Sequence, residues 1–217
     1  MRSYGQYCSV ARALDVIGDR WNLLIVRELT IRGPSRYTDL QAGLPGIATN
    51  LLADRLRELE RAGVVARLQA PPPVATTLFE LTPRGEELRP VMQELGRWGI
   101  ELMPQTDPGF AFRSHWLALP VALYLVDREP DGPPITIEVR VGEEPMVIEA
   151  SGGAVSTHAG SADEPDLVLS GPHRTFLGVL ARKLGLAEAR ARGLSVEGNV
   201  AALERLLPEP LAPEPAA

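Results

Sequence analysis

The sequence predicts an α+β protein of two domains, in which a mainly α-helical N-terminal domain precedes an α+β domain with an antiparallel sheet. The length of 217 residues corresponds to one or two domains at roughly 150 residues each. Apolar residues recur at helical spacing over most of the first hundred residues, whereas strand-like alternation dominates after Pro104. The charge changes at the same place: residues 1–104 hold 13 basic and 12 acidic residues, and residues 105–217 hold 9 and 16.

The composition and the cysteine count exclude several classes of protein. The longest apolar run, Trp116 to Val126, is 11 residues long and contains Pro120, whereas a helix that spans a bilayer needs roughly 18 or more. The start of the chain has no apolar segment of the kind that a secretory signal requires. A single cysteine, Cys8, rules out an intramolecular disulfide and a multi-cysteine zinc site. We therefore expect a cytoplasmic protein that makes no membrane contact.

The N-terminal domain is predicted to contain five helices and one β-hairpin. In chain order these are a helix over Cys8 to Ile17, a helix that includes Trp21 to Leu29, a short helix over Arg36 to Ala42, a helix from Thr49 that stops at Gly63, strands over Val64 to Leu68 and Thr77 to Leu81, and a helix after Thr82. Gly33-Pro34 ends the second helix, and Ser35 and Thr49 are N-cap candidates for the third and fourth. Pro83 suits the first position of the fifth.

This order of elements is typical of a winged helix-turn-helix domain. In the helix after Thr49, four leucines share one face, which we expect to pack against the preceding helices. The opposite face would then be free to enter the major groove of DNA, where base edges can be read. The leucines are Leu51, Leu52, Leu56 and Leu59, and the residues opposite them are Asn50, Ala53, Asp54, Arg57 and Arg61.

Six residues are predicted to contact DNA: Arg36, Thr49, Asn50, Asp54, Arg57 and Arg67. Asn50 can make paired hydrogen bonds to an adenine, and Arg57 can reach a guanine or a phosphate. Arg36, on the preceding helix, can anchor the DNA backbone. Residues 20–67 hold eight arginines and five acidic residues, which permits such contacts in a chain whose net charge is −6. The alternative is that this face is an ordinary solvated helix surface.

Distinctive segments occur at fixed spacings between residues 8 and 103. They are Cys8 to Trp21 (CSVARALDVIGDRW), Leu23 to Leu29 (LLIVREL), Gly33 to Leu40 (GPSRYTDL), Leu44 to Ile47 (LPGI), Asn50 to Leu52 (NLL), Arg55 to Glu60 (RLRELE) and Leu81 to Gly85 (LTPRG). Together they closely resemble the HxlR-type winged helix family of bacterial transcription regulators. The resemblance implies a DNA-binding homodimer that pairs through the first helix and the helix after the wing. The apolar stripe from Leu88 to Leu102 suits such a surface; the alternative is that it packs against the second domain.

Two departures from the family pattern change the expected contacts. The segment Gln69 to Thr76 carries three consecutive prolines where the family usually has basic or aromatic residues, and Arg67 is the only cation near it. We therefore expect weak or absent contacts between this wing and the minor groove. The segment Asp19-Arg20-Trp21 replaces the usual Gly-Lys-Trp, so it keeps the cation but adds an acid.

Cys8 stands where some redox-sensing members of the family carry a reactive cysteine. A thiolate at the start of a helix is favoured by the helix dipole, and Arg12, one turn later, can favour it further. Cys8 is therefore a candidate redox sensor. The alternative is that Cys8 is a small buried apolar residue.

The C-terminal domain, over residues 112–207, is predicted to be an α+β layer whose helices cover one face of an antiparallel sheet. The expected elements are a helix over Phe110 to Val126 that is interrupted near Pro120, strands over Ile135 to Val141, Met146 to Ala150, Ala154 to His158 and Asp166 to Leu169, helices over Arg174 to Leu184 and Leu186 to Arg192, a strand over Leu194 to Gly198, and a helix over Val200 to Leu207. Residues 1–104 would form the N-terminal domain, 105–111 the linker, and 208–217 a disordered tail with four prolines.

Three segments of this domain, Pro165 to Leu169, Phe176 to Leu180 and Leu194 to Gly198 with the amphipathic helix after it, resemble the sterol-carrier-protein-2-like domain. The resemblance implies an apolar cavity between sheet and helices that accepts lipids or other hydrophobic molecules. The predicted lining is Trp116, Leu119, Leu177, Leu180 and Leu184. The alternative for each of these residues is the ordinary core.

The three histidines, His115, His158 and His173, show no metal-ligand or triad spacing, and the sequence lacks a nucleophile elbow, a phosphate loop and a dinucleotide fingerprint. We therefore expect no enzymatic activity, no metal and no cofactor. The combined expectation is a homodimeric, sequence-specific DNA-binding transcription regulator that is controlled by a small hydrophobic effector in its C-terminal domain. Two alternatives stay open: a redox-sensing regulator that acts through Cys8, and a lipid-binding or enzymatic C-terminal domain with the N-terminal domain as an interaction module.

Overall fold

The computed structural model describes residues 3–70, 76–103 and 109–209. The chain forms two compact units, Met1–Thr106 and Asp107–Ala217, here called the N-terminal and C-terminal units. Three predicted features lie outside the described residues, wholly or for the most part: the proline run 71–73, the linker 105–111 and the tail 208–217. No helix in the described ranges is long and apolar enough to cross a membrane.

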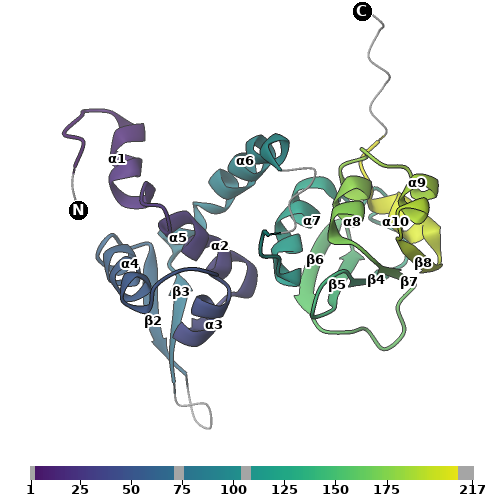
Figure 1. Ribbon diagram of the computed structural model, residues 1–217, viewed down its shortest axis with the longest axis horizontal. Coiled ribbons are helices and arrows are strands. Elements are labelled where there is room, and N and C mark those ends of the chain that lie inside the picture. Colours follow the sequence, from purple (N-terminus) through teal and green to yellow (C-terminus); the bar gives the residue numbers. More distant parts are fainter. Residues whose placement is uncertain (1–2, 71–75, 104–108, 210–217) are drawn as a thin grey trace, which may run out of the picture. The chain divides into compact units, whose positions relative to one another are not determined.

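The N-terminal unit contains the predicted helices and hairpin (Figure 1). Its elements are α1 (Ser9–Ile17), α2 (Asn22–Arg32), β1 (Ser35–Arg36), α3 (Tyr37–Ala42), α4 (Thr49–Arg61), β2 (Val65–Gln69), β3 (Thr77–Leu81), α5 (Pro83–Glu86), α6 (Arg89–Gly99) and the 3-10 turn η1 (Ile100–Leu102). The three strands form one antiparallel sheet in the order β1-β3-β2. The hairpin of β2 and β3 is the wing.

The core of the N-terminal unit lies between α2, α3 and α4 and is closed by the wing and α6. It consists of Ile25, Val26, Leu29, Leu40, Leu44, Ile47, Leu52, Leu56, Leu59, Val64, Val65, Phe79 and Met92. Three of the four leucines on the predicted apolar face of α4 are fully buried, and Leu51 packs against the same cluster. The inward orientation of this face is therefore confirmed.

Two N-cap predictions were wrong. Ser35 is not the cap of α3, because Ser35 and Arg36 pair with β3 as the third strand of the sheet and Arg36 takes the cap position. Thr49 is the first residue of α4, and Ala48 precedes it as the N-cap. The Thr49 hydroxyl instead accepts a hydrogen bond from Gln41 Nε2 at 2.9 Å, so this side chain ties α4 to α3.

The single helix expected after Thr82 is divided into α5, α6 and η1. Thr82 does cap α5, since its hydroxyl accepts from Gly85 N at 3.1 Å. Pro90 lies in the first turn of α6, where a helix needs no backbone donor. Pro90 also has no N–H to donate to the carbonyl of Glu86, so α5 ends there and α6 begins at Arg89.

The C-terminal unit is a five-stranded sheet with helices (Figure 1). Its elements are the 3-10 turn η2 (Ser114–Leu117), α7 (Ala118–Tyr124), β4 (Ile135–Arg140), β5 (Met146–Ser151), β6 (Ala154–Ala159), β7 (Leu167–Ser170), α8 (His173–Leu180), α9 (Leu186–Ala191), β8 (Ser195–Gly198) and α10 (Val200–Leu206). The core joins one face of the sheet to α7, α8 and α10, as the residues of its buried cluster show.

The prediction of an antiparallel sheet was wrong for one strand pair. The strand order is β6-β5-β4-β7-β8, and β7 runs parallel to β4. After β6 the chain crosses the sheet face to enter β7 from the opposite end. The crossing covers Glu138 of β4, which is 1% exposed. Its carboxylate accepts from Arg140 Nε at 2.5 Å and from Ala162 N at 2.9 Å, and these bonds, that of Arg140 first, hold the pKa of Glu138 below its ordinary value.

The helix expected over Phe110 to Val126 is divided into η2 and α7 at Leu117–Ala118, shortly before Pro120, and α7 continues through Pro120 itself. Pro120 stands in the first turn, where a helix needs no backbone donor. Past this helix, Asp127 and Arg205 form a buried pair with distances of 2.7 and 2.9 Å. Arg205 also donates to Pro133 O, and Asp127 accepts from Gly153 N, so the pair joins α10 to two loops.

Candidate nucleic-acid interface

The outer face of α4 is open to solvent and carries the residues that the sequence predicts there. Asn50, Asp54, Arg57 and Arg61 are exposed, and Ala53 is half-buried. Asn50 Oδ1 accepts a hydrogen bond from Leu51 N at 3.0 Å, which leaves the side-chain NH₂ pointing to no described acceptor. The face therefore presents the Asn50 amide and the Arg57 guanidinium on its first three turns and the Arg61 guanidinium in its last turn.

Side chains from α3 and from the turn before α2 hold α4 in place. Tyr37 Oη donates to Thr49 O at 2.5 Å, at the first residue of the helix. Arg55 is largely buried and pairs with Asp19 and with Glu58, the latter at 2.6 Å. The Arg55 side chain is thus packed while its head pairs with acids, as is common for long charged side chains. These contacts fix the outer face relative to the body of the unit.

A buried carboxylate lies behind the turn between α3 and α4. Glu28 of α2 is 0% exposed, and its oxygens accept from Arg27 Nη2 at 2.7 Å and from Arg32 Nε at 3.3 Å. Arg27 also donates to Gly43 O at 3.3 Å. Burial lowers the pKa of Arg27, and the Glu28 charge opposes that effect. The cluster connects α2 to the turn that leads into α4, and no sequence signal pointed to it.

Two of the arginines predicted to contact DNA are paired with acids on the same surface. Arg57 Nη2 lies 2.5 Å from Asp54 Oδ1, one turn earlier. Arg67 Nε lies 2.7 Å from Glu60 Oε1, and its guanidinium stands 5.4 Å from the centre of the Phe79 ring. Arg36 is exposed and forms no ion pair within the described part of the chain. A bound polyanion would therefore compete with acids at two of these three positions.

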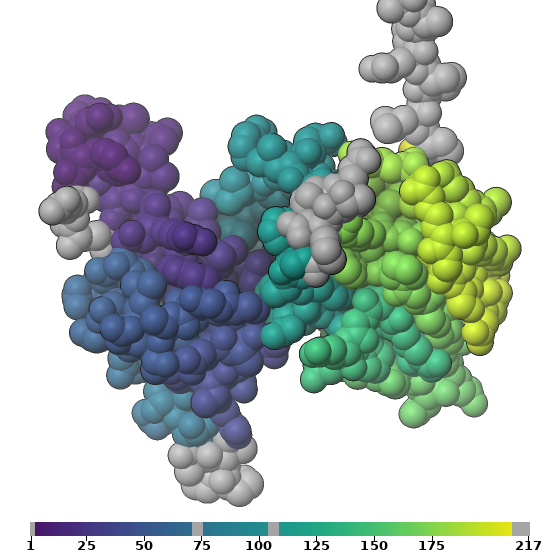
Figure 2. All heavy atoms as spheres, viewed as in Figure 1, coloured from purple at the N-terminus to yellow at the C-terminus, as the bar shows by residue number. Residues whose placement is uncertain are grey.

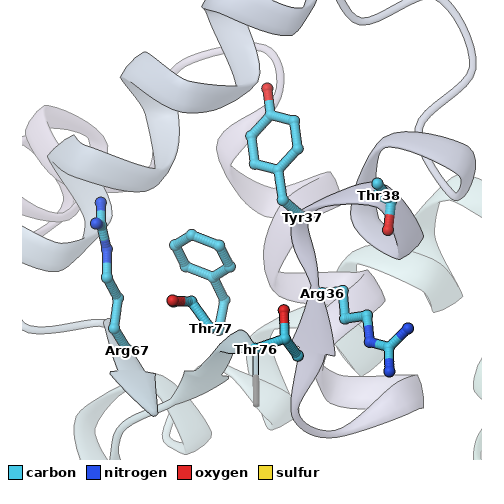
Figure 3. Close-up of a pocket in the computed structure, with 7 residues that line it drawn as sticks. Arg36, Tyr37, Thr38, Arg67, Thr76 and Thr77 are labelled. Carbon is cyan, nitrogen blue, oxygen red and sulfur yellow. The ribbon is translucent and has the colours of Figure 1, made fainter. Parts of the chain in front are cut away.

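A hollow of about 350 Å³ lies between the start of α3 and the wing. Its lining residues are Arg36, Tyr37, Thr38, Arg67, Thr76, Thr77 and Phe79. Figure 3 shows Arg67 on one side, Arg36 on the other, and Thr76 and Thr77 between them. Sequence reasoning found the two arginines but missed the threonines, because their neighbours in space come from three separate segments.

A second surface of the N-terminal unit is apolar and exposed. On α1, Val10 is 65% and Leu14 43% exposed; on α6, Trp98 is 69% exposed. Figure 2 shows α1, in purple, standing out from the rest of this unit. Further exposed apolar residues of the same segments are Tyr4, Tyr7, Val91, Leu95, Leu102 and Met103. So much exposed apolar surface is unusual for a monomer and typical of an interaction site.

Cys8 is exposed at the N-cap of α1, so the alternative of a buried residue is wrong. Arg12, which we expected to favour a thiolate at Cys8, is instead bonded elsewhere: its Nη1 donates to Asp15 at 2.8 Å and to Ser3 Oγ at 3.1 Å. Asp15 also accepts from Tyr4 N at 2.8 Å, and this bond, more than that of Ser3, holds the pKa of Asp15 below its ordinary value. The segment before α1 is thereby fastened to it.

The five residues predicted to line an apolar cavity lie in different surroundings. Leu180 is fully buried in the core of the C-terminal unit, and Leu177 and Leu184 are half-buried against it. Trp116 and Leu119 are half-buried, and the Trp116 ring meets the His115 ring edge-on at 6.0 Å. A hollow of about 240 Å³ on the sheet includes none of these five residues, and its lining is half polar, as at Thr136, Glu149 and Ser156, and half apolar. The apolar ligand site stays a prediction.

The fold of the N-terminal unit and the exposed outer face of α4 define a winged helix-turn-helix protein. The family model of the HxlR-like helix-turn-helix matches residues 16–107. YvaP of Bacillus subtilis, an HTH-type transcriptional regulator, is 35% identical over 99 residues, which cover 46% of this chain and 88% of YvaP. The chain belongs to the HxlR-like helix-turn-helix family, and its matched relatives are transcriptional regulators.

One further relative, YodB, is matched both by its sequence and by a solved structure. The HTH-type transcriptional regulator YodB of B. subtilis is 36% identical over 95 residues, which cover 44% of this chain and 84% of YodB. The solved structure of the reduced form of YodB is 32% identical and covers 47% of this chain and all of that one, with a TM-score of 0.40. The family match ends at residue 107, so it describes the N-terminal unit.

Proposed function

We propose that this protein is a homodimeric transcription regulator that reads an operator with the outer face of α4. The observation that carries the proposal is the burial of Leu52, Leu56 and Leu59 behind an exposed Asn50 and Arg57, in a chain of a family of transcription regulators. Asn50 is suited to adenine and Arg57 to guanine, and both stand on the first three turns, which in this fold enter the major groove.

The test compares the binding of two duplexes, one from the promoter of the protein's own gene region and one of mixed sequence. Replacing Asn50 and Arg57 by alanine should remove the preference for the promoter, since each bidentate contact supplies about 1–3 kcal/mol of discrimination. Arg192→Ala is the matched control, because Arg192 is equally exposed and paired with an acid but lies in the C-terminal unit. If the double variant still prefers the promoter duplex, α4 is not the helix that reads the operator.

The homodimer is supported by the exposed apolar residues of α1 and α6. A surface of this kind becomes favourable when a second copy covers it, and closed two-fold dimers are the commonest assembly. A dimer also matches DNA sites whose halves lie one helical turn apart, about 34–36 Å. Sedimentation equilibrium of the wild-type chain checks the stoichiometry.

We further propose that the C-terminal unit binds a small hydrophobic effector, as a sterol-carrier-protein-2-like domain would. A sheet with helices packed on one face supports this proposal, because such layers can enclose an apolar site between them. An effector that prefers one orientation of the C-terminal units would shift the spacing of the two α4 helices. Mass spectrometry of the natively purified protein should find a bound hydrophobic molecule.

Deletion of residues 108–217 separates this proposal from the alternative in which the N-terminal unit is only an interaction module. The regulator keeps operator binding and loses the effector response, whereas an interaction module shows no operator binding in either form. A catalytic activity of the full chain would favour an enzymatic C-terminal unit.

The redox alternative is supported by the exposure of Cys8. Under this alternative, the Cys8→Ser variant binds DNA as the wild type does but no longer responds to an oxidant. A response that survives in Cys8→Ser excludes Cys8 as the sensor, because the sequence has no other cysteine.

A further inference from the structure

The hollow of about 240 Å³ in the C-terminal unit lies on the face of the sheet that points away from the core. Alternate residues of β4 and β5, such as Ile137 and Ile148, belong to the buried cluster under the helices. Because side chains alternate along a strand, Thr136 and Glu149 point to the opposite, outer face. The hollow on this face is lined by residues of β4, β5 and β6.

Three polar side chains stand in a row across the hollow. Glu149 of β5 is in register with Thr136 of β4 on one side and with Ser156 of β6 on the other. Residues directly opposite each other in antiparallel strands hold their Cβ atoms about 4.5–5.5 Å apart. The Glu149 side chain therefore stands between two side chains that carry hydroxyls, and all three line the hollow.

The polar groups of this row have few partners within the described chain. The hydroxyls of Thr136 and Ser156 form no hydrogen bond with any described residue. The charged neighbour of Glu149 is His158, whose Nε2 lies 3.7 Å from Glu149 Oε1, and both side chains are about half exposed. This imidazole carries a charge only when it is protonated. Glu149 therefore has no permanent cationic partner among the described residues, unlike Glu138 of the same face, which pairs with Arg140.

The composition of the lining indicates the class of ligand. No arginine, lysine or histidine lines the hollow, so the one charge in its lining is negative. The rest of the lining is mostly apolar and consists of Pro134, Ile135, Ala150, Ser151 and Ala154. A primary ammonium group has three N–H donors, which match one carboxylate and two hydroxyls as acceptors. Mg²⁺ and Ca²⁺ fit less well, because they take about six or more oxygen ligands.

We propose that this hollow binds a small primary amine in its ammonium form. The ammonium group donates to Glu149, Thr136 and Ser156, and the alkyl part of the amine lies over Pro134 and Ala154. The site is separate from the one proposed for a hydrophobic effector, because it lies on the other face of the sheet. The two proposals therefore stand or fall independently.

The first test is a titration of the full chain with hexylammonium chloride, followed by NMR of the backbone amides. Saturable shifts should be centred on the strands around the hollow, with a Kd on the order of 1 mM for so small a ligand in an open site. Hexanol has the same alkyl chain without the charge, and hexyltrimethylammonium has the charge without N–H donors. Each should bind at least about tenfold more weakly than hexylammonium, because each loses the charge-assisted hydrogen bonds. Equal binding of either compound would overturn the proposal.

The second test uses variants of the row. Glu149→Gln should weaken the binding of hexylammonium by about tenfold or more, and Ser156→Ala by about two- to tenfold. Glu197→Gln is the matched control, because Glu197 is an exposed carboxylate on β8, two strands away from β4. All three variants should keep the Tm of the wild type, since the replaced side chains are exposed. Glu149→Gln that binds hexylammonium as Glu197→Gln does would overturn the proposal.

A competition experiment separates an amine site from a metal site. Magnesium chloride and sodium chloride at equal ionic strength should displace hexylammonium from the wild type to the same extent. A selective effect of Mg²⁺ that disappears in Glu149→Gln would assign the hollow to a metal ion and would overturn the proposal.

Discussion

Replacement of Gly43 by alanine should destabilise the N-terminal unit and disturb α4. Gly43 has an ordinary φ of −76°, so space and not backbone strain decides the outcome. A Cβ built on this residue would lie 2.0 Å from Oε2 and 2.6 Å from the carboxyl carbon of Glu28. The Glu28 carboxylate has no exposed surface and forms ion pairs with Arg27 and Arg32, so it cannot move towards solvent without breaking one of these ion pairs.

The expected cost combines two effects. Overpacking of a filled site costs about 1–3 kcal/mol, and loss of one partner of a buried ion pair costs up to about 3–5 kcal/mol. A total of at least about 2 kcal/mol corresponds to a fall in Tm of about 8–16 °C for a unit of this size. Affinity for the operator duplex should fall as well, because Gly43 lies in the turn that leads into α4.

Calorimetry of the full chain measures the effect with two internal references. The transition of the C-terminal unit should not move. Gly96→Ala in α6, where the new Cβ meets no atom within 4 Å, should stabilise the unit by about 0.5–1 kcal/mol. A Gly43→Ala protein that unfolds at or above the wild-type temperature would refute the packing argument.

Three other substitutions test separate parts of the molecule. Asp127→Asn should lower the free energy of unfolding of the C-terminal unit at neutral pH, because hydrogen bonds, first from Arg205, hold the pKa of Asp127 below its ordinary value of 3.8. In urea unfolding, the difference in this free energy between variant and wild type should narrow as the pH falls through the lowered pKa. A difference that stays constant with pH would contradict this. Trp98→Ala should convert the dimer to monomers in sedimentation equilibrium without lowering the Tm of the monomer, because the side chain is 69% exposed; a dimer of unchanged affinity would show that α6 is not part of the interface. Asp54→Asn should strengthen DNA binding, because the Asp54 carboxylate repels a phosphate. The variant should change the stability little, because the ion pair of Asp54 with Arg57 is exposed. Weaker DNA binding would instead indicate that Asp54 accepts a hydrogen bond from a cytosine.

The parts of the fold that could be predicted from the sequence are those set by local spacing. The leucine repeat predicted α4 and its buried face, and Thr82-Pro83 predicted the start of α5. The alternation of apolar residues predicted every strand of both sheets except β1 to within one or two residues. In each case the signal and the structure involve the same short segment.

The errors come from contacts between distant segments. Ser35 has the residue type of an N-cap, but its backbone pairs with Phe79, which lies far along the chain. The parallel pairing of β7 with β4 depends on how residues 160–166 cross the sheet, and no period in the sequence records that path. The burial of Glu28 and Glu138 was missed for the same reason, since Glu28 lies against Gly43 and Glu138 against Ala162, although their arginine partners are near in the sequence.

In the candidate site, too, the features set by local spacing could be predicted, and those set by contacts between distant segments could not. Asn50, Arg57 and Arg36 could be found because helical spacing places them on an outer face or a helix start. The pairing of Arg67 with Glu60 and its stacking on Phe79 depend on how the wing packs beside α4. The threonines of the hollow between α3 and the wing gave no signal, because a threonine hydroxyl is ordinary until an arginine from another segment lies near it.

The ion pairs of the outer surface determine how this unit can bind DNA. Arg57 and Arg67 must exchange an acid for a phosphate, and the released Asp54 and Glu60 stay close to the duplex. Each exchange therefore contributes less binding free energy than an unpaired arginine would, and a single N-terminal unit should bind DNA weakly. A dimer offsets this weakness, because binding of one half-site raises the effective concentration of the second unit at the other. It follows that Trp98→Ala, which touches no DNA, should cost more operator affinity than the loss of any one arginine on the surface.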